Sequence, residues 1–122
     1  MSRQSIRDAF KTAIQQVYSG PIYQTRLTDT RNDPESVQIY LTSGDVSTYT
    51  TFTETQAEIV IEFSKQGATD AQLDAVADQI TSTLLSDATL KTTIKHCKFD
   101  AYSYEQQENG LQAIRLNFGI LY

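Results

Sequence analysis

Residues 46–64 read VSTYTTFTETQAEIVIEFS and are the most informative stretch of this chain. In the second half of the stretch, apolar residues at every second position predict a strand with one buried face, through Ala57, Ile59, Ile61 and Phe63. Residues 46–55 are also rich in residues that favour strands, but they have no continuous apolar face. A single strand through the whole stretch would be about 60 Å long at roughly 3.3 Å per residue, which exceeds the width of a small domain. The threonine-rich half must therefore bend away from the sheet, or project beyond it as a loop or arm.

The segments before this stretch predict a helix and two strands. Apolar residues from Ile6 to Tyr18 recur at spacings of three and four, as in a helix, and Ser19-Gly20-Pro21 is expected to end it. Residues 22–27 are predicted to form a short strand and residues 29–36 a polar loop. Residues 37–42 alternate as a half-buried strand does, and a turn is expected at residues 43–45, Ser-Gly-Asp.

Two helices and a hairpin are predicted after this stretch. A turn at residues 66–68 precedes Thr69 and Gln72, which fit a capping box at the start of the second helix. The buried face of that helix is predicted to hold Leu73, Val76, Ala77, Ile80 and Leu84, with Leu85 as a further candidate. Asp87 can cap a short third helix, and Asn109-Gly110 is a strong hairpin signal between two final strands.

The order of these elements indicates an α+β fold. Strands joined by hairpins favour a mostly antiparallel sheet, with two main helices and one short helix packed on it. A chain of 122 residues has the size of one domain, and no internal repeat or linker divides residues 1–122.

Charge and cysteine content exclude several classes of protein. The formal net charge of −5 repels phosphate backbones, so a surface that grips nucleic acid is not expected. Cys97 is the only cysteine, which excludes an internal disulfide and a zinc site built on cysteine pairs. We find no signal-peptide pattern and no apolar run long enough to cross a bilayer, so synthesis in a reducing cytoplasm is expected.

Few residues form a pattern typical of catalysis or metal binding. His96 and Cys97 are sequence neighbours, and a Cys–His nucleophile pair is one hypothesis, but a buried Cys97 beside an exposed His96 is the expected arrangement. Asp29, Asp33 and Glu35 lack the ligand order of a calcium loop, so a solvated acidic loop is predicted. We therefore predict no catalytic residue, no cofactor and no metal site.

Charged residues on the predicted sheet have a structural explanation. Glu58 and Glu62 lie four residues apart on one strand face. A catalytic carboxylate pair needs a further group that raises one pKa, and none is visible in the sequence. We expect these carboxylates on an exposed sheet face, paired with Lys or Arg.

Aromatic residues are the candidates for an interaction surface. Exposed aromatic side chains bury much area on binding at a low entropic cost, and they are frequent at interfaces. We expect Tyr49 and Phe52 in a contact surface and Tyr102 in the core, while Tyr40 and Tyr104 could serve in either place. Alternation in the strand from Lys98 places two sets on opposite faces: Phe99, Ala101 and Ser103 on one, and Asp100, Tyr102 and Tyr104 on the other.

Several short motifs, in a fixed order, carry a resemblance to a known family. They are residues 37–42 (VQIYLT), 56–62 (QAEIVIE), 72–75 (QLDA), Ile80, 85–87 (LSD), Leu90, 102–104 (YSY) and 116–122 (LNFGILY). In this order and spacing the chain resembles the minor tail protein U family of lambdoid phages, the tail terminators of long, non-contractile tails. The similarity covers nearly the whole chain, which is expected to form a single tail-terminator-like domain over residues 1–122.

The resemblance implies a structural function. Terminators of this family form a hexameric ring on the head-proximal end of the tail tube, stop its polymerisation and provide a surface for joining the head. The implied partners are further copies of the chain, the tail tube protein and a head–tail neck protein, while DNA passes through the lumen without specific binding and no membrane is involved. The implied location is the virion tail, after assembly in the host cytoplasm.

The family also implies a role for the threonine-rich segment. The part that matches Gly44 to Thr55 is a mobile loop in the free subunit and lies near ring or tube contacts. The residues expected to contact a neighbouring subunit or the tube are Ser47, Thr48, Tyr49, Thr50, Thr51, Phe52, Thr53, Glu54 and Thr55.

Three alternatives stay open from the sequence. A related neck or tail-completion protein of the head–tail joint shares the same α+β design. A small enzyme would use Cys97 and His96. A ligand-binding module would hold its ligand between the helices and the sheet.

Overall fold

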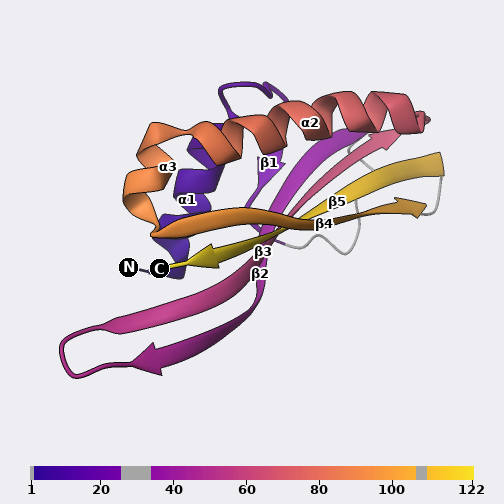
Figure 1. The fold of residues 1–122 in the computed structure, drawn as a ribbon. Helices are drawn as coiled ribbons and strands as arrows, with labels where there is room; N and C mark the ends of the chain where they lie inside the picture. The colour runs from indigo at the N-terminus through magenta and orange to yellow at the C-terminus, as the bar shows by residue number, and fades with distance from the viewer. Residues whose placement is uncertain (1, 26–33, 107–109) are drawn as a thin grey trace.

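The structure, a computed structural model, describes residues 2–25, 34–106 and 110–122. The strands in these ranges are β1 (Ile22–Tyr23), β2 (Glu35–Thr48), β3 (Thr53–Gln66), β4 (His96–Gln106) and β5 (Leu111–Leu121). They form one sheet in the order β1-β2-β3-β5-β4, in which β1 is parallel to β2 and the other neighbouring pairs are antiparallel. Three helices, α1 (Arg3–Ile14), α2 (Asp70–Ser86) and α3 (Ala88–Thr93), cover one face of the sheet (Figure 1). The predicted α+β class with a mostly antiparallel sheet is confirmed.

Local side-chain caps fix where the helices begin. At the start of α2, the Thr69 hydroxyl accepts from the Gln72 backbone N–H, and the Gln72 side chain accepts from the Thr69 N–H. Asp87 accepts a hydrogen bond of 2.8 Å from the Leu90 N–H and so begins α3. Each cap satisfies a backbone donor that the helix leaves unpaired, so both predicted starts are confirmed.

The end of α1 differs from the prediction. The helix stops at Ile14 instead of Tyr18, and the chain continues in a turn in which the Val17 and Tyr18 N–H groups both donate to the Ile14 carbonyl. Tyr18 is nevertheless buried, with its ring edge against Phe63 at 5.8 Å between centroids. The apolar spacing therefore identified the buried residues but not the helix end.

The core lies between the helices and the inner face of the sheet. Strand register aligns Ile39 of β2 with Ile61 of β3 and Leu116 of β5, all nearly or fully buried. Helix residues from α1, α2 and α3 pack onto this face in one cluster that includes Phe10, Leu73, Ile80 and Leu90. Burying each such side chain contributes about 1.5–3 kcal/mol, so this layer is the main source of stability.

Residues 43–45 do not form the predicted turn. Strand β2 runs through them to Thr48, with a register shift between Leu41 and Ser43. Gly44 lies opposite Ala57, and a Cβ added there would come within 3.3 Å of the Thr55 Cγ2. The glycine thus allows a close approach of two strands and does not reverse the chain, which is why its sequence signal was misleading.

Strand β4 contains a second irregularity that changes the predicted faces. The register with β5 shifts between Phe99 and Ala101, so Asp100 is an extra residue in the ladder. Phe99, Tyr102 and Tyr104 consequently lie opposite the core residues of β5, on the face covered by helices. The prediction that Phe99 and Tyr102 face opposite ways is wrong, because regular alternation cannot include the bulge.

The predicted acidic loop is only partly described. Asp29 and Asp33 lie outside the described residues, and so do the last two residues of the predicted 22–27 strand. Glu35 belongs to β2, where its Oε1 lies 3.9 Å from the Lys65 Nζ.

Over the described ranges, His, Cys, Asp and Glu side chains form no group of three or more that could hold a metal ion. None of the helices described is both long and apolar enough to cross a membrane.

Candidate interaction surface

A two-stranded arm, residues 46–55, extends from the sheet and leaves the globular part of the chain (Figure 1). Strand β5 pairs with β3 only as far as Gln56, and Tyr122 exchanges both backbone hydrogen bonds with Thr55. Beyond that point β2 and β3 pair only with each other, through Val46↔Thr55 and Thr48↔Thr53. The projection predicted from strand length, as a loop or arm, is present in the form of an arm, a paired hairpin.

The tip of the arm carries two stacked aromatic rings. Tyr49 and Phe52 lie 4.5 Å apart between ring centroids at an interplanar angle of 25°, and the Tyr49 N–H donates to the Phe52 carbonyl at 2.8 Å. Both side chains are half exposed, and Val46 is 65% exposed. A lone two-stranded ribbon is only marginally stable in water, so apolar side chains at its end are better suited to contacting another surface than to supporting the fold.

One lysine links the arm to the globular part. The Lys95 Nζ lies 3.0 Å from the Glu54 Oε2 and 5.0 Å from the centroid of the Phe52 ring. The Lys95 backbone N–H donates to Leu121, so the lysine itself is held beside the last strand. An exposed ion pair contributes up to about 1 kcal/mol and an exposed cation–π contact about 0.5–1 kcal/mol. Lys95 therefore biases the position of the arm without fixing it.

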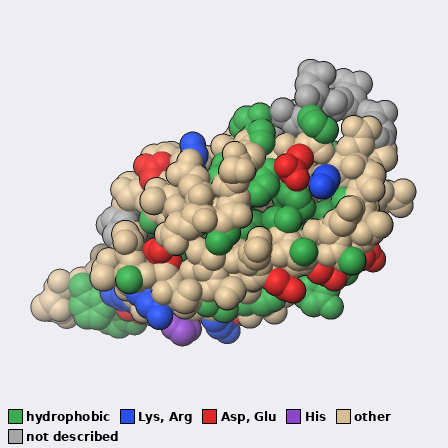
Figure 2. All heavy atoms as spheres, turned by 90° about the horizontal axis from the view of Figure 1, so that it is seen from above, with side chains coloured by type: hydrophobic (Ala, Val, Ile, Leu, Met, Phe, Trp, Pro, Cys, Tyr) green, Lys and Arg blue, Asp and Glu red, His purple; other side chains and the backbone are tan. Residues whose placement is uncertain are grey.

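The arm and its parent strands are acidic. Residues 34–64 contain five Asp or Glu residues and no Lys or Arg: Glu35, Asp45, Glu54, Glu58 and Glu62. Basic residues gather instead at the corner formed by α3 and the start of β4, namely Lys91, Lys95 and Lys98. Figure 2 shows Lys or Arg side chains on both sides of the single histidine, near the end of the molecule where hydrophobic atoms mark the arm tip.

Glu58 and Glu62 of β3, on the face of the sheet without helices, bind side chains of the neighbouring strand β5. Glu62 is 4% exposed and accepts a hydrogen bond from the Arg115 guanidinium, which also lies 3.4 Å from Glu105. The hydrogen bond to Glu62 raises the pKa of Arg115 above its ordinary value. Glu58 accepts from the Asn117 side chain at 3.3 Å. The expected Lys or Arg partner is present for Glu62, but that carboxylate is buried and not exposed as predicted.

A second group of exposed aromatic residues lies along β4. Tyr102 is 61% exposed, so the prediction that it is a core residue is wrong, because α2 covers the inner strands and leaves this edge open. The Tyr104 hydroxyl donates a short hydrogen bond to Asp74 of α2, and this bond raises the pKa of Tyr104 to about 12. Tyr40, in contrast, is buried on the helix-free face.

Comparison with known proteins identifies the family. A family model described as phage minor tail protein U matches residues 1–122, the whole chain. The chain belongs to the phage minor tail protein U family. It is therefore a structural protein of a phage-type tail, and the sequence-based recognition is confirmed.

Solved structures add a likeness in fold. One chain from a structure entitled "Virion of native gene transfer agent (GTA) particle" has a TM-score of 0.69 and 14% sequence identity, covering 94% of this chain and 92% of that one. At this identity the likeness concerns the fold alone. Curated protein sequences gave no match.

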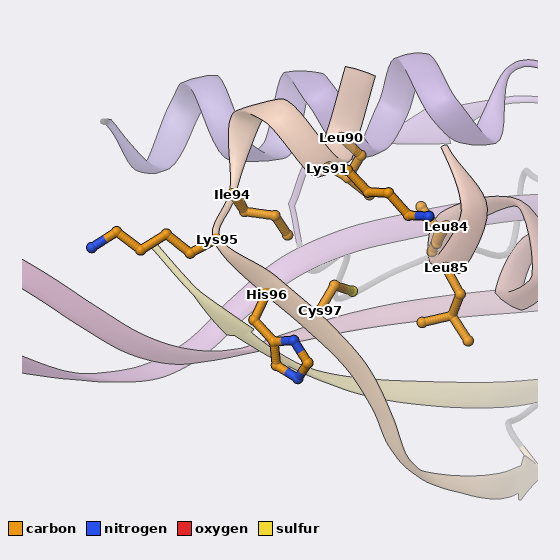
Figure 3. A pocket seen from close by; sticks show the side chains of 8 residues that line it. All are labelled: Leu84, Leu85, Leu90, Lys91, Ile94, Lys95, His96 and Cys97. Atoms are coloured by element: carbon orange, nitrogen blue, oxygen red, sulfur yellow. The ribbon is translucent and has the colours of Figure 1, made fainter. Parts of the chain in front are cut away.

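The neighbouring pair His96 and Cys97 does not form a nucleophile site in this family member. Consecutive strand residues point to opposite faces, and Figure 3 shows the two side chains leaving β4 in different directions. Burial, and to a lesser extent Asp100, raises the pKa of the Cys97 thiol to about 11. The thiol is therefore protonated at neutral pH, which is the opposite of what an activated cysteine requires.

Sequence reasoning found the aromatic tip of this tail protein but missed what surrounds it. All nine predicted contact residues, from Ser47 to Thr55, lie on the arm. Lys95 was not predicted as a partner, because its contacts with Glu54 and Phe52 join segments about 40 residues apart. The sequence shows only that Glu54 lies in a polar segment and that Lys95 follows a predicted helix. Neither fact identifies the two residues as partners.

Proposed function

We propose that this chain is the tail terminator of its particle. Copies of it form a ring on the head-proximal end of the tail tube, stop the addition of tube subunits and offer a surface to the head. The observation that supports this most is the arm, which presents Tyr49 and Phe52 to solvent in a member of a tail-protein family. The proposed place of action is the virion tail, after assembly in the host cytoplasm.

A ring of identical subunits requires two different patches on each subunit, one of which contacts the other on the next copy. The arm is well suited to be one of them, because it projects from the body and carries aromatic anchors. Tyr is among the residue types that dominate binding energy at interfaces. Ser47 to Thr55 are accordingly the proposed contacts with a neighbouring subunit or with the tube.

The charge of the chain suits a ring that DNA crosses. In a ring of six, the number that the family resemblance implies, the formal charge is 6 × −5 = −30. A strongly acidic ring repels the phosphate backbone and gives DNA no stable binding site. A neck protein of the joint remains the second candidate, since proteins of that kind share the same α+β design.

Growth of the tube separates these candidates. Purified chain would be mixed with tube subunits during polymerisation, and tube lengths measured by electron microscopy. A terminator yields tubes that stop growing and carry the chain at one end. A neck protein binds only to tubes that are already terminated, and free growth in the presence of the chain would refute the proposal.

A further inference from the structure

A pocket lies at the corner where α2, α3 and β4 meet, and it has a volume of about 320 Å³. Figure 3 shows its lining residues, which come from the end of α2, from α3, from the connection between α3 and β4, and from the first residues of β4: Leu84, Leu85, Leu90, Lys91, Ile94, Lys95, His96 and Cys97. Most of these side chains are apolar, while Lys91 and Lys95 supply positive charge. This volume is at the lower end of the range typical of ligand pockets and can admit an aromatic side chain.

The chemistry of the pocket complements that of the arm. The arm offers stacked aromatic rings at its tip, with Glu54 and Asp45 as the acidic residues nearest to them. The pocket offers apolar walls with lysines among them. Phe52 and Glu54 already contact Lys95 within one chain, so the attraction between this kind of arm and this kind of lysine is present in the structure itself.

Two other hollows suit the arm tip less well. The hollow between α2 and β4 is lined by Asp74 and Asp78, which repel an acidic segment. The hollow beside the start of α1 is lined by Gly44, Val46 and Thr55, which belong to the arm or its base. Its apolar lining together with its two lysines therefore favours the pocket at the α2–α3–β4 corner over these two hollows.

We infer that this pocket receives the arm tip of a second copy of the chain, with an aromatic side chain of residues 49–52 between Leu85 and Ile94. This inference rests on the proposed function, because it names the second patch that a ring requires. Lys91 has no carboxylate within ion-pair distance among the residues described, so it is available to the acidic arm of the neighbour. Each subunit then gives one arm and receives one, which is the head-to-tail arrangement that closes into a ring.

The single cysteine makes the contact directly testable. Cys97 lines the pocket and is half-buried, and every other position of the chain lacks a thiol. Thr50→Cys and Thr51→Cys, made separately, place a second thiol at the exposed arm tip and keep Tyr49 and Phe52. Disulfides form only when the two Cα atoms come within about 7 Å, so a bond between the new thiol and Cys97 of another copy reports an arm in the pocket.

The variants would be oxidised on tubes that they have capped and analysed by non-reducing electrophoresis. Because every subunit contributes two thiols to two different neighbours, the expected result is a ladder from dimer up to the closed ring. The same variant with Cys97→Ser should give a dimer at most, and Ala71→Cys, at the exposed start of α2, should give no ladder.

The outcomes separate this inference from the function on which it rests. Capped tubes without a ladder from either variant overturn the arm-in-pocket contact and leave termination intact. A ladder that stops at dimers in both variants also overturns the arm-in-pocket contact, because it indicates two subunits that bind each other symmetrically and not a head-to-tail ring.

A charge reversal in the pocket gives an independent measure. Lys91→Glu should raise the concentration needed for capping by about tenfold without changing the melting temperature. An unchanged capping concentration counts against the contact.

Discussion

The Nζ of Lys95 lies 3.0 Å from the Oε2 of Glu54, and this ion pair joins the base of the arm to the segment between α3 and β4. The same ammonium group lies over the Phe52 ring. One side chain thus reaches both the acidic and the aromatic part of the arm. Because about half of the lysine side chain is exposed, these contacts orient the arm weakly and leave it able to move onto a partner.

Replacing Lys95 with Ala should loosen the arm and leave the fold unchanged. The free energy of unfolding should fall by less than about 1 kcal/mol, because the ion pair is partly exposed to solvent. Backbone amides of residues 46–55 should exchange hydrogen faster, as measured by mass spectrometry. Lys98→Ala, which removes a somewhat more exposed lysine paired with Asp100, is the control and should leave arm exchange unchanged. Equal exchange in the two variants would contradict this role of Lys95.

Shortening the arm should give a folded subunit that assembles poorly. Replacing residues 47–54 with Asn-Gly, a favoured two-residue hairpin turn, keeps the Val46↔Thr55 pair and the hydrogen bonds between Thr55 and Tyr122. Circular dichroism should show the same secondary structure apart from the lost residues, because the core lies outside the arm. Sedimentation should detect a monomer under conditions in which the full chain forms rings. A shortened chain that forms rings equally well would refute the proposed contact segment.

The aromatic tip should matter for assembly and little for stability. Tyr49→Ser with Phe52→Ser removes a stacked pair that is half exposed, so the loss of stability should stay within about 1 kcal/mol. Capping of tubes should fall by more than tenfold if these rings are anchors. Tyr102→Ser removes an aromatic ring of greater exposure from β4 and serves as the matched control. Similar capping by the two variants would argue against a special role for the tip.

Core substitutions should have the reverse effect. Phe63 is fully buried between the helices and the sheet, and Phe63→Ala should cost about 3–5 kcal/mol through lost burial and the cavity left behind. Val46→Ala, at a position that is 65% exposed, should cost less than about 0.5 kcal/mol. Urea unfolding monitored by circular dichroism measures both values. A small effect at Phe63 would show that the assigned core is wrong.

Asp87 should make stability depend on pH in the acidic range. A hydrogen bond from the Gln16 side chain, at 2.8 Å, and one from the Leu90 N–H hold the pKa of Asp87 below its ordinary value of 3.8. The folded state therefore favours the charged carboxylate, and the resulting stability is present above about pH 4 and is lost as pH falls through the lowered pKa. Asp87→Asn should be less stable than the native chain at pH 6, and the difference should shrink toward pH 3. A difference that stays constant with pH would contradict this assignment.

Much of the fold could be predicted because its determinants are local. The capping box at Thr69 and the core-facing residues from Ala57 to Phe63 are set by nearby residues, and both appear in the structure as predicted. The opposite face of this strand was predicted to be exposed, but Val60, Glu62 and Ser64 on it are buried as well. The continuous path of β2 through Gly44 and the bulge at Asp100 could not be predicted, because both depend on the partner strand. Alternation describes a strand only while its register with the neighbouring strand is unbroken.

The candidate interaction surface also has one part that the sequence predicts, the arm, and one part that it does not, the pocket. The arm could be predicted because residues 46–55 lack an apolar face and a strand of such length cannot fit in a small domain. The pocket at the α2–α3–β4 corner could not, because Leu84, Ile94 and Cys97 come together only when the helices pack on the sheet. In the sequence, nothing distinguishes Lys91 and Lys95 of this pocket from ordinary solvent-exposed lysines.

The most direct test of termination by the arm is a challenge of finished tubes. Tubes assembled with the full chain, and tubes assembled with the Asn-Gly variant that lacks residues 47–54, would be exposed to fluorescently labelled tube subunits and imaged. Tubes made with the full chain should take up no label at the end that carries it. Tubes made with the shortened chain should extend with label at both ends. Labelled growth at the end occupied by the full chain would show that the chain does not terminate the tube.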